Sequence, residues 1–434
     1  MKMSKLENLP AHNDSLLRFM TCGSVDDGKS TLIGRLLYDT KTILADTLTQ
    51  IERTSQKRGM ESVDLSLLTD GLQAEREQGI TIDVAYRYFS TGTRKYIIAD
   101  APGHEQYTRN MVTAASTANL AIILIDARKG VLTQTRRHSY LAQLVGIPHI
   151  VVAINKMDLV DYSQAEFERI RATYLEFAEQ IGLQRNGRDI HFVPMSALNG
   201  DMIVDRGTAM PWYQGPTVLE LLESAPPAHS ERTESFRFPV QFVCRPHASD
   251  NPELHDFRGF MGRIESGNIA VGDEVIVLPS GLSSRVKAIQ LGDVALPHAI
   301  TEQSVTILLE DEIDISRGDM IVKKTDVPAP VKQLNAMVCW LSETPLSPAR
   351  TYIIRHTTRE SKAKVASIAY KIDVNTTEQL AAEGSLNMND IASISFKLAQ
   401  PLMVDPYAVN RATGSFIIID ESTNNTVGAG MVQA

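Results

Sequence analysis

The residues best suited to chemistry stand in the stretch GSVDDGKS, from Gly23 to Ser30. A glycine, four free positions and then Gly-Lys-Ser is the spacing of the Walker A phosphate-binding loop. Glycines let backbone amides turn toward phosphate oxygens, and Lys29 places a positive charge on the outer phosphates. The Ser30 hydroxyl is a ligand for Mg²⁺, and a helix beginning there adds its N-terminal dipole. The alternative is a chance glycine turn before a helix. The loop residues expected at the nucleotide are Gly23, Val25, Asp26, Asp27, Gly28, Lys29, Ser30 and Thr31.

Two further segments carry residues for the γ-phosphate and the metal. The segment DAPGH runs from Asp100 to His104 and follows an apolar run, where a Walker B aspartate stands. Asp100 can hold Mg²⁺ through water, and Gly103 can offer its amide to the γ-phosphate. The segment GITI lies between the loop helix and the second strand, and it places Thr81 to bind Mg²⁺ and sense the γ-phosphate.

Two more segments predict which base is bound. The segment NKMD ends in Asp158, whose carboxylate can accept hydrogen bonds from guanine N1 and N2, whereas adenine has no matching donors. An unpaired buried carboxylate lowers affinity, so this arrangement selects guanine. In the segment SAL, from Ser196 to Leu198, a backbone amide can face the guanine carbonyl oxygen. Each short segment alone is weak, but all of them in this order predict a Mg·GTP site. The residues expected at the base are Asn155, Lys156, Asp158, Ser196, Ala197 and Leu198.

Strands and helices must alternate to position these segments. The apolar run LLRFMTCG, residues 16–23, predicts a buried strand, and the residues after it have helical spacing. Further apolar runs end just before the polar segments, with helical patterns between them. This alternation predicts a mostly parallel, doubly wound sheet, in which ligands bind beyond the carboxyl ends of the strands.

The pattern changes after SAPPAHSERTES, residues 224–235, which is rich in Pro and Ser and reads as a linker. Short strands with glycine turns follow and predict a β-barrel. KKTDVPAPVKQ, residues 323–333, predicts a second linker before another set of strands. The predicted organisation is an α/β P-loop GTPase domain over 1–228, followed by two all-β barrel domains over 236–326 and 332–434.

Composition limits the class of protein. The chain has 434 residues, of which 43% are hydrophobic and 22% charged, as in globular proteins with several domains. No apolar run reaches the ~18 residues of a membrane span, and the first residues have no apolar core like that of a secretory signal. Cys22, Cys244 and Cys339 lie far apart and are expected to be thiols in a reducing cytoplasm. The net charge of −9 indicates no bulk affinity for nucleic acid, although a local basic patch remains open.

The five segments together resemble the translation-factor branch of P-loop GTPases, typified by elongation factor Tu. That branch has a GTP-binding domain followed by two β-barrels. The resemblance implies that His104, directly after DAPG, orients the attacking water, and that Val25 and Ile80 form an apolar gate beside it. The alternatives are a His104 that caps or packs the next helix and ordinary packing of the two apolar residues.

Within this branch, residues 75–111 are most similar to the GTPase subunits of bacterial sulfate adenylyltransferases. Gln78 stands where translation factors have Arg or Lys, EQYTRNM follows PGH, and residues 257–281 also agree. Ala101 departs from the threonine more usual in the family, at a spacer position. No second GxxxxGK[ST] occurs, so an appended adenylylsulfate kinase is not expected.

The resemblance implies GTP and Mg²⁺ as cofactors and a partner that is the catalytic sulfate adenylyltransferase subunit. That partner binds ATP and sulfate and forms adenosine phosphosulfate and pyrophosphate, a reaction whose equilibrium strongly favours the reactants. The resemblance also implies that GTP hydrolysis on this chain drives this reaction. A heterodimer or higher assembly in the cytoplasm is expected, with no membrane and no nucleic acid.

Two other functions stay open at this point. A carrier of aminoacyl-tRNA would need a basic face on the barrels. The barrels do contain arginines, namely Arg258, Arg285, Arg350, Arg355 and Arg359. Arginines more commonly lie on a solvated surface with no such role. A regulatory GTPase switch without energy coupling would have the same nucleotide site.

Overall fold

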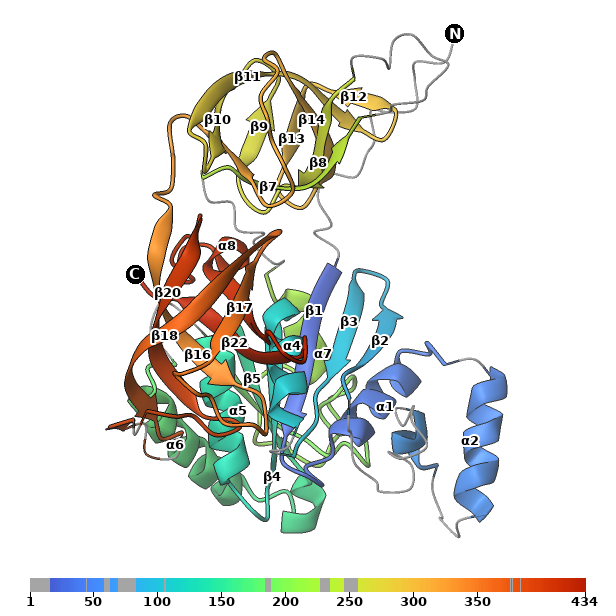
Figure 1. Ribbon diagram of the computed structural model, residues 1–434. Helices are drawn as coiled ribbons and strands as arrows, with labels where there is room; N and C mark the ends of the chain where they lie inside the picture. Colours follow the sequence, from blue (N-terminus) through green and yellow to red (C-terminus); the bar gives the residue numbers. More distant parts are fainter. Residues whose placement is uncertain are drawn as a thin grey trace, which may run out of the picture. The chain divides into compact units, whose positions relative to one another are not determined.

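The computed structural model separates the chain into two compact units. The first is Met1–Ala228 with Val374–Thr377, and the second is His229–Asp373 with Glu378–Ala434. The structure describes residues 16–43, 45–57, 63–68, 83–104, 107–183, 189–226, 235–245, 257–374, 376, 378–382 and 384–434. Each unit has its own sheets, drawn in Figure 1.

A six-stranded sheet forms the middle of the first unit, with the strand order β2-β3-β1-β4-β5-β6 (Figure 1). β2 runs antiparallel to β3, and the other pairings are parallel. All seven residues of β4 are buried, because helices cover both faces of a parallel sheet. The strands are β1 Leu16–Gly23, β2 Ala85–Ser90, β3 Lys95–Asp100, β4 Leu120–Asp126, β5 His149–Asn155 and β6 Asp189–Pro194.

The chain moves from β1 to the edge strand β2, turns back through β3, and then passes β1 to reach β4, β5 and β6. Right-handed connections in opposite directions place helices on opposite faces of a sheet. α1 contacts β1 and β3, whereas α4 and α5 contact each other and β1. The winding direction changes at β1, so a ligand site is expected beyond its carboxyl end. The helices are α1 Lys29–Asp39, α2 Ala45–Lys57, α4 Thr108–Thr117, α5 Thr133–Leu144, α6 Gln164–Gln180 and α7 Val218–Ser224, with 3-10 turns η1 Leu65–Leu68 and η3 Met157–Val160.

The second unit begins with a closed barrel. Its strand order is β10-β15-β7-β8-β14-β11-β12, and pairing of β10 with β11 closes the ring. Phe238, Phe260 and Ile307 are among the side chains that fill it. The strands are β7 Arg237–Cys244, β8 Gly259–Arg263, β9 Asn268–Ala270, β10 Glu274–Leu278, β11 Leu282–Leu291, β12 Val294–Leu296, β13 His298–Ile300, β14 Ser304–Leu309 and β15 Met320–Lys323.

A second closed barrel follows in the same unit, with the order β17-β21-β22-β16-β20-β18-β19 and closure by β17 with β18. Trp340 and Tyr352 meet edge to face in its core, with ring centroids 5.7 Å apart. The elements are β16 Val331–Trp340, β17 Thr351–His356, β18 Arg359–Ile372, β19 Gln379–Leu380, β20 Ile391–Leu402, α8 Arg411–Gly414, β21 Ser415–Asp420 and β22 Thr426–Val432. The predicted fold class, an α/β GTPase domain followed by β-barrels, is confirmed.

The predicted linkers differ from the structure in one respect. β15 extends to Lys323 and β16 begins at Val331, so the ends of the predicted linker 323–333 are strand residues. A bidentate ion pair joins the two barrels: Arg237 Nε and Nη2 each donate to a carboxylate oxygen of Asp405 at 2.9 Å. The guanidinium is buried, so its pairing is needed to offset its desolvation. Most of the other predicted linker, residues 224–235, lies outside the described residues.

Candidate functional site

The phosphate loop connects β1 to α1, and glycine is required in it for steric reasons. Gly28 has φ 93°, and a Cβ there would lie 2.4 Å from Asn155 Nδ2. A Cβ on Gly103 would lie 2.7 Å from both Lys29 Nζ and Gly23 O. At both glycines, atoms of other segments therefore lie closer than a side chain at that position would permit.

Lys29 is the buried cation of this loop. Its Nζ donates to Gly23 O at 2.9 Å and to Ser24 O at 2.8 Å. Burial lowers the pKa of Lys29, and the nearby carboxylates of Asp100 and Asp27 oppose this effect. An anion bound at the loop would favour the charged form further. Because α1 begins at Lys29 and has no acidic residue in its first turn, the helix dipole also favours an anion there.

The middle of the loop is held by its own side chains. Asp27 Oδ2 accepts from Ser24 N at 2.6 Å, while its buried Oδ1 has no hydrogen-bond partner in the described part of the chain. Burial raises the pKa of Asp27. Asp26 is exposed with φ 67°, and Val25 is half-buried. Asp27 therefore stabilises the loop from within, while Asp26 and Val25 lie toward its surface.

Two of the three predicted metal ligands lie among the described residues, Ser30 on α1 and Asp100 at the end of β3. Ser30 and Thr31 are in the first turn of α1 and are half-buried. Asp100 ends β3, is buried, and accepts from Thr21 Oγ1 at 3.2 Å. A hydroxyl and a carboxylate are oxygen ligands of the kind Mg²⁺ takes, so these residue types fit the metal. Thr81 and Ile80 lie outside the described residues.

His104 follows directly after the Gly103 that contacts the phosphate loop. It is half-buried, and its ring lies edge-on to Tyr107 with centroids 6.3 Å apart. The buried Nδ1 has no hydrogen-bond partner among the described residues. The packing against Tyr107 agrees with the structural alternative for His104, and the unpartnered nitrogen leaves it able to bond to water.

Asn155 joins the phosphate loop to the base segment. Its Nδ2 donates to Asp27 O at 2.7 Å, and its Oδ1 accepts from Ala197 N at 2.9 Å. Both contacts are buried. The first residue of NKMD therefore holds two predicted segments together, rather than leaving its amide for solvent.

The segments NKMD and SAL follow the neighbouring strands β5 and β6. Met157 N donates to Met195 O at 3.2 Å, and Met195 N donates to Ile154 O at 2.8 Å, which ties the two segments together. Asp158 is half-buried in the first turn of η3. Ser196 is buried, whereas the Leu198 side chain is 57% exposed, so Leu198 can contribute through its backbone.

An ion-pair network that the sequence patterns did not indicate supports Lys156. Asp126 ends β4, and its Oδ2 lies 3.1 Å from Lys156 Nζ and 2.7 Å from Arg128 Nη2. Burial raises the pKa of Asp126, but hydrogen bonds from Arg128 and Lys156 outweigh this and set it at about 2. Asp126 is therefore a fixed anion. No motif contains it, although its place at a strand end was a signal.

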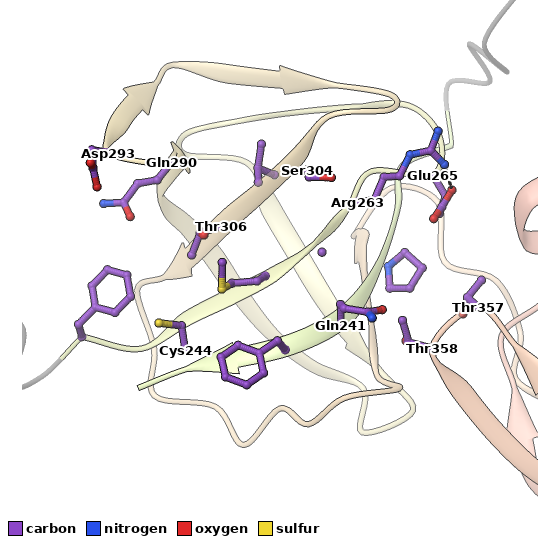
Figure 2. Close-up of a pocket in the computed structure, with 17 residues that line it drawn as sticks. Gln241, Cys244, Arg263, Glu265, Gln290, Asp293, Ser304, Thr306, Thr357 and Thr358 are labelled. Carbon is purple, nitrogen blue, oxygen red and sulfur yellow. Dashed lines mark hydrogen bonds and ion pairs between the residues drawn. The ribbon is translucent and has the colours of Figure 1, made fainter. Parts of the chain in front are cut away.

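The second unit contains an open cavity of about 1140 Å³, lined mostly by the first barrel and also by Thr357 and Thr358 of the second (Figure 2). Gln241 and Cys244 of β7, Arg263 of β8 and Thr306 of β14 are among its lining residues. Arg263 pairs with Glu265 at 2.8 Å, so its charge is already matched. The cavity has none of the phosphate-loop features seen in the first unit.

The motif-bearing unit defines the chain as a GTP-binding protein of the elongation factor Tu type. The family model "Elongation factor Tu GTP binding domain" matches residues 14–228, and "GTP-eEF1A C-terminal domain-like" matches 333–433. More narrowly, the chain belongs to the sulfate adenylyltransferase subunit 1 family. Relatives with that name share 55% identity in Cellvibrio japonicus (strain Ueda107) and 54% in Saccharophagus degradans, each over 96% of this chain and 86% of the relative. The predicted resemblance is confirmed.

Among solved structures, sup35 complexed with GDP is 22% identical over 100% of this chain and 97% of its own, with a TM-score of 0.43. The fold assignment rests on the strand order of the sheets instead. In the part of the chain that the structure describes, no helix is long and apolar enough to cross a membrane.

Proposed function

We propose that this chain is the GTPase subunit of a sulfate adenylyltransferase, in which GTP hydrolysis drives formation of adenosine phosphosulfate and pyrophosphate from ATP and sulfate. The observation that carries the proposal is the joining of phosphate loop and base segment through Asn155, in a chain 55% identical to a sulfate adenylyltransferase subunit 1. The proposed domains are a GTP-binding domain, 1–228, and barrels 236–326 and 332–434.

Each end of the nucleotide has its own residues. Gly23 to Gly28 offer backbone amides, and Lys29 moves from the loop carbonyls to the outer phosphates. Ser30, Thr81 and Asp100 would hold Mg²⁺, which neutralises phosphate charge when bound. At the base, Asp158 accepts from guanine N1 and N2, while Lys156 is kept in place by Asp126.

His104 is proposed to orient the water that attacks the γ-phosphate. Its half-buried ring, whose Nδ1 has no hydrogen-bond partner in the part of the chain that the structure describes, leaves a hydrogen-bonding group beside Gly103, whose amide would face the same phosphate. Val25 and Ile80 would shield this water on the other side. The role is one of positioning, because phosphoryl transfer depends mainly on orientation and charge.

The ATP and sulfate sites are proposed to lie on a separate catalytic subunit in the cytoplasm. The relatives are named "subunit 1", which implies a further subunit. This chain has one phosphate-loop motif, and Asp158 commits it to guanine. Adenylyl transfer must therefore be carried out on the partner, in a heterodimer or higher assembly.

The arginines of the barrels argue against a tRNA carrier. All five that were candidates for a basic face are paired with carboxylates in the structure. The pairs are Arg258–Asp314, Arg285–Glu274, Arg350–Asp420, Arg355–Glu360 and Arg359–Asp319. A phosphate backbone would have to displace these partners, so these five arginines do not favour tRNA binding.

The test is an end-point assay with the purified two-subunit complex and labelled sulfate. Product is followed with GTP, with a non-hydrolysable GTP analogue and with neither. Reversible binding cannot shift an overall equilibrium, so the analogue should change the rate alone, whereas GTP should raise the final product level. Equal final levels with GTP and analogue would support the regulatory switch and reject energy coupling. Filter binding to tRNA at several salt concentrations tests the alternative function as a tRNA carrier.

A further inference from the structure

Arg35 connects the helix that begins at the phosphate site to the turn that follows β6. Its Nε donates to Ala197 O at 3.3 Å, and its Nη2 donates to Leu198 O. Its Nη1 lies 3.7 Å from Asp39 Oδ1 on the same helix, and the side chain is 19% exposed. The guanidinium therefore pairs with Asp39 and donates hydrogen bonds to two successive carbonyls of the SAL segment.

These contacts determine which way one peptide group faces. In a trans peptide, the carbonyl and the following N–H point in opposite directions. Because Ala197 O faces Arg35, the N–H of Leu198 faces the other side of the turn.

The neighbouring amides of this turn already have acceptors. Ala197 N donates to Asn155 Oδ1 at 2.9 Å, and Asn199 N donates to Ser196 Oγ at 3.2 Å. Within the described ranges, Leu198 N has no protein acceptor. A donor held in place without an acceptor is what a ligand carbonyl requires.

We infer that Arg35 is a positioning residue for guanine selection, because it holds the Leu198 N–H toward guanine O6. The inference rests on the proposed guanine-nucleotide site. At the same position adenine carries an amino group, so two donors would face each other. Asp158 reads N1 and N2, and the Leu198 amide adds a second, independent test of the base. Because Arg35 is on α1, the helix that meets the phosphates also stabilises base selection.

The test combines a change in the protein with a change in the ligand, measured by calorimetry. GDP is compared with 6-thio-GDP, which keeps the N1 and N2 donors but replaces O6 with sulfur, a weak acceptor. Arg35→Ala should weaken GDP binding roughly three- to tenfold and 6-thio-GDP binding less than about twofold. Arg35→Lys, which keeps a donor on the same helix, should give a smaller loss for GDP.

The matched control is Arg169→Ala on α6, an exposed arginine paired with Glu166 at 2.8 Å, which should leave both ligands unchanged. Equal losses for GDP and 6-thio-GDP in both Arg35 variants would overturn the inference, since a general loosening of the turn ignores the ligand atom. A wild-type chain that binds neither nucleotide would reject the proposed function, and the inference with it.

Discussion

The proposed phosphate end and the proposed guanine end of the site are built in different ways. At the phosphate end, most of the residues come from one continuous segment, 23–31. A Cβ added at Gly23, Gly28 or Gly103 would lie less than 3 Å from a neighbouring atom. At the guanine end, side chains from four places in the chain hold short turns in position: Arg35, Asp126, Asn155 and Asp158. From this difference we expect binding at the phosphate end to depend on steric fit and to be lost abruptly, and binding at the guanine end to depend on hydrogen bonds and to be lost in steps.

The largest expected effect is on turnover at the phosphate end. His104→Ala should lower stimulated GTP hydrolysis by roughly 10²–10⁴, because a positioned group at the water is removed. GDP affinity should stay within about twofold, because the ring of His104 packs on Tyr107 and its Nδ1 has no hydrogen-bond partner among the described residues. Single-turnover hydrolysis and calorimetry measure the two quantities. If the rate of hydrolysis falls by less than about threefold, the result would support a packing role of His104 against Tyr107.

Gly28→Ala tests the steric character of the phosphate end. A Cβ at 2.4 Å from Asn155 Nδ2 forces the two loops apart, and φ 93° is unfavourable for alanine. We expect GDP affinity to fall by about 10²-fold, measured by calorimetry. Gly92→Ala is the control, because a Cβ there meets nothing within 4 Å. If both variants bind GDP equally well, the loop is not sterically limited.

Asp158→Asn tests the stepwise character of the guanine end. An amide can donate to the C2 carbonyl of xanthine, whereas guanine has an amino group there. GTP affinity should fall by tenfold or more, and XTP affinity should rise. Both changes should lie within about 5- to 150-fold, the range expected for leaving one buried polar group unpaired. Competition between the two nucleotides gives the ratio. A parallel loss of both would mean that Asp158 has a structural role instead.

Asp126→Asn should give the smallest effect and a dependence on pH. Ion pairing lowers the pKa of Asp126 to about 2, below its ordinary ~3.9, so its contribution to stability is present above about pH 4 and is lost as pH falls toward 2. At pH 7 the variant should unfold at a lower urea concentration than wild type. This difference in urea midpoint should become smaller below about pH 4. GDP affinity at pH 7 should fall roughly twofold to tenfold. A gap that widens in acid would contradict the ion-pair account.

Predictability from sequence differs between the same two ends. The apolar run 16–23 coincides with β1, and the loop after it has the predicted strand–turn–helix context, because local spacing determines both. The roles assigned to the site residues, the metal ligands included, stay predictions. The contacts of Asn155 with Asp27 and Ala197 did not follow from the motif, since they join segments 128 and 42 residues apart.

The amino-acid sequence by itself determined the class of ligand, the order of domains and the family, because glycine spacing, apolar periodicity and strand-end motifs are local properties of the chain. Tertiary structure alone decided how the base turn is held. Asp126 and Arg35 are ordinary polar residues in segments without a motif, and they become important because the sheet and α1 bring them to Lys156 and to the carbonyls of Ala197 and Leu198. Hydrogen bonds act over about 3 Å, and only the folded chain sets which groups come that close.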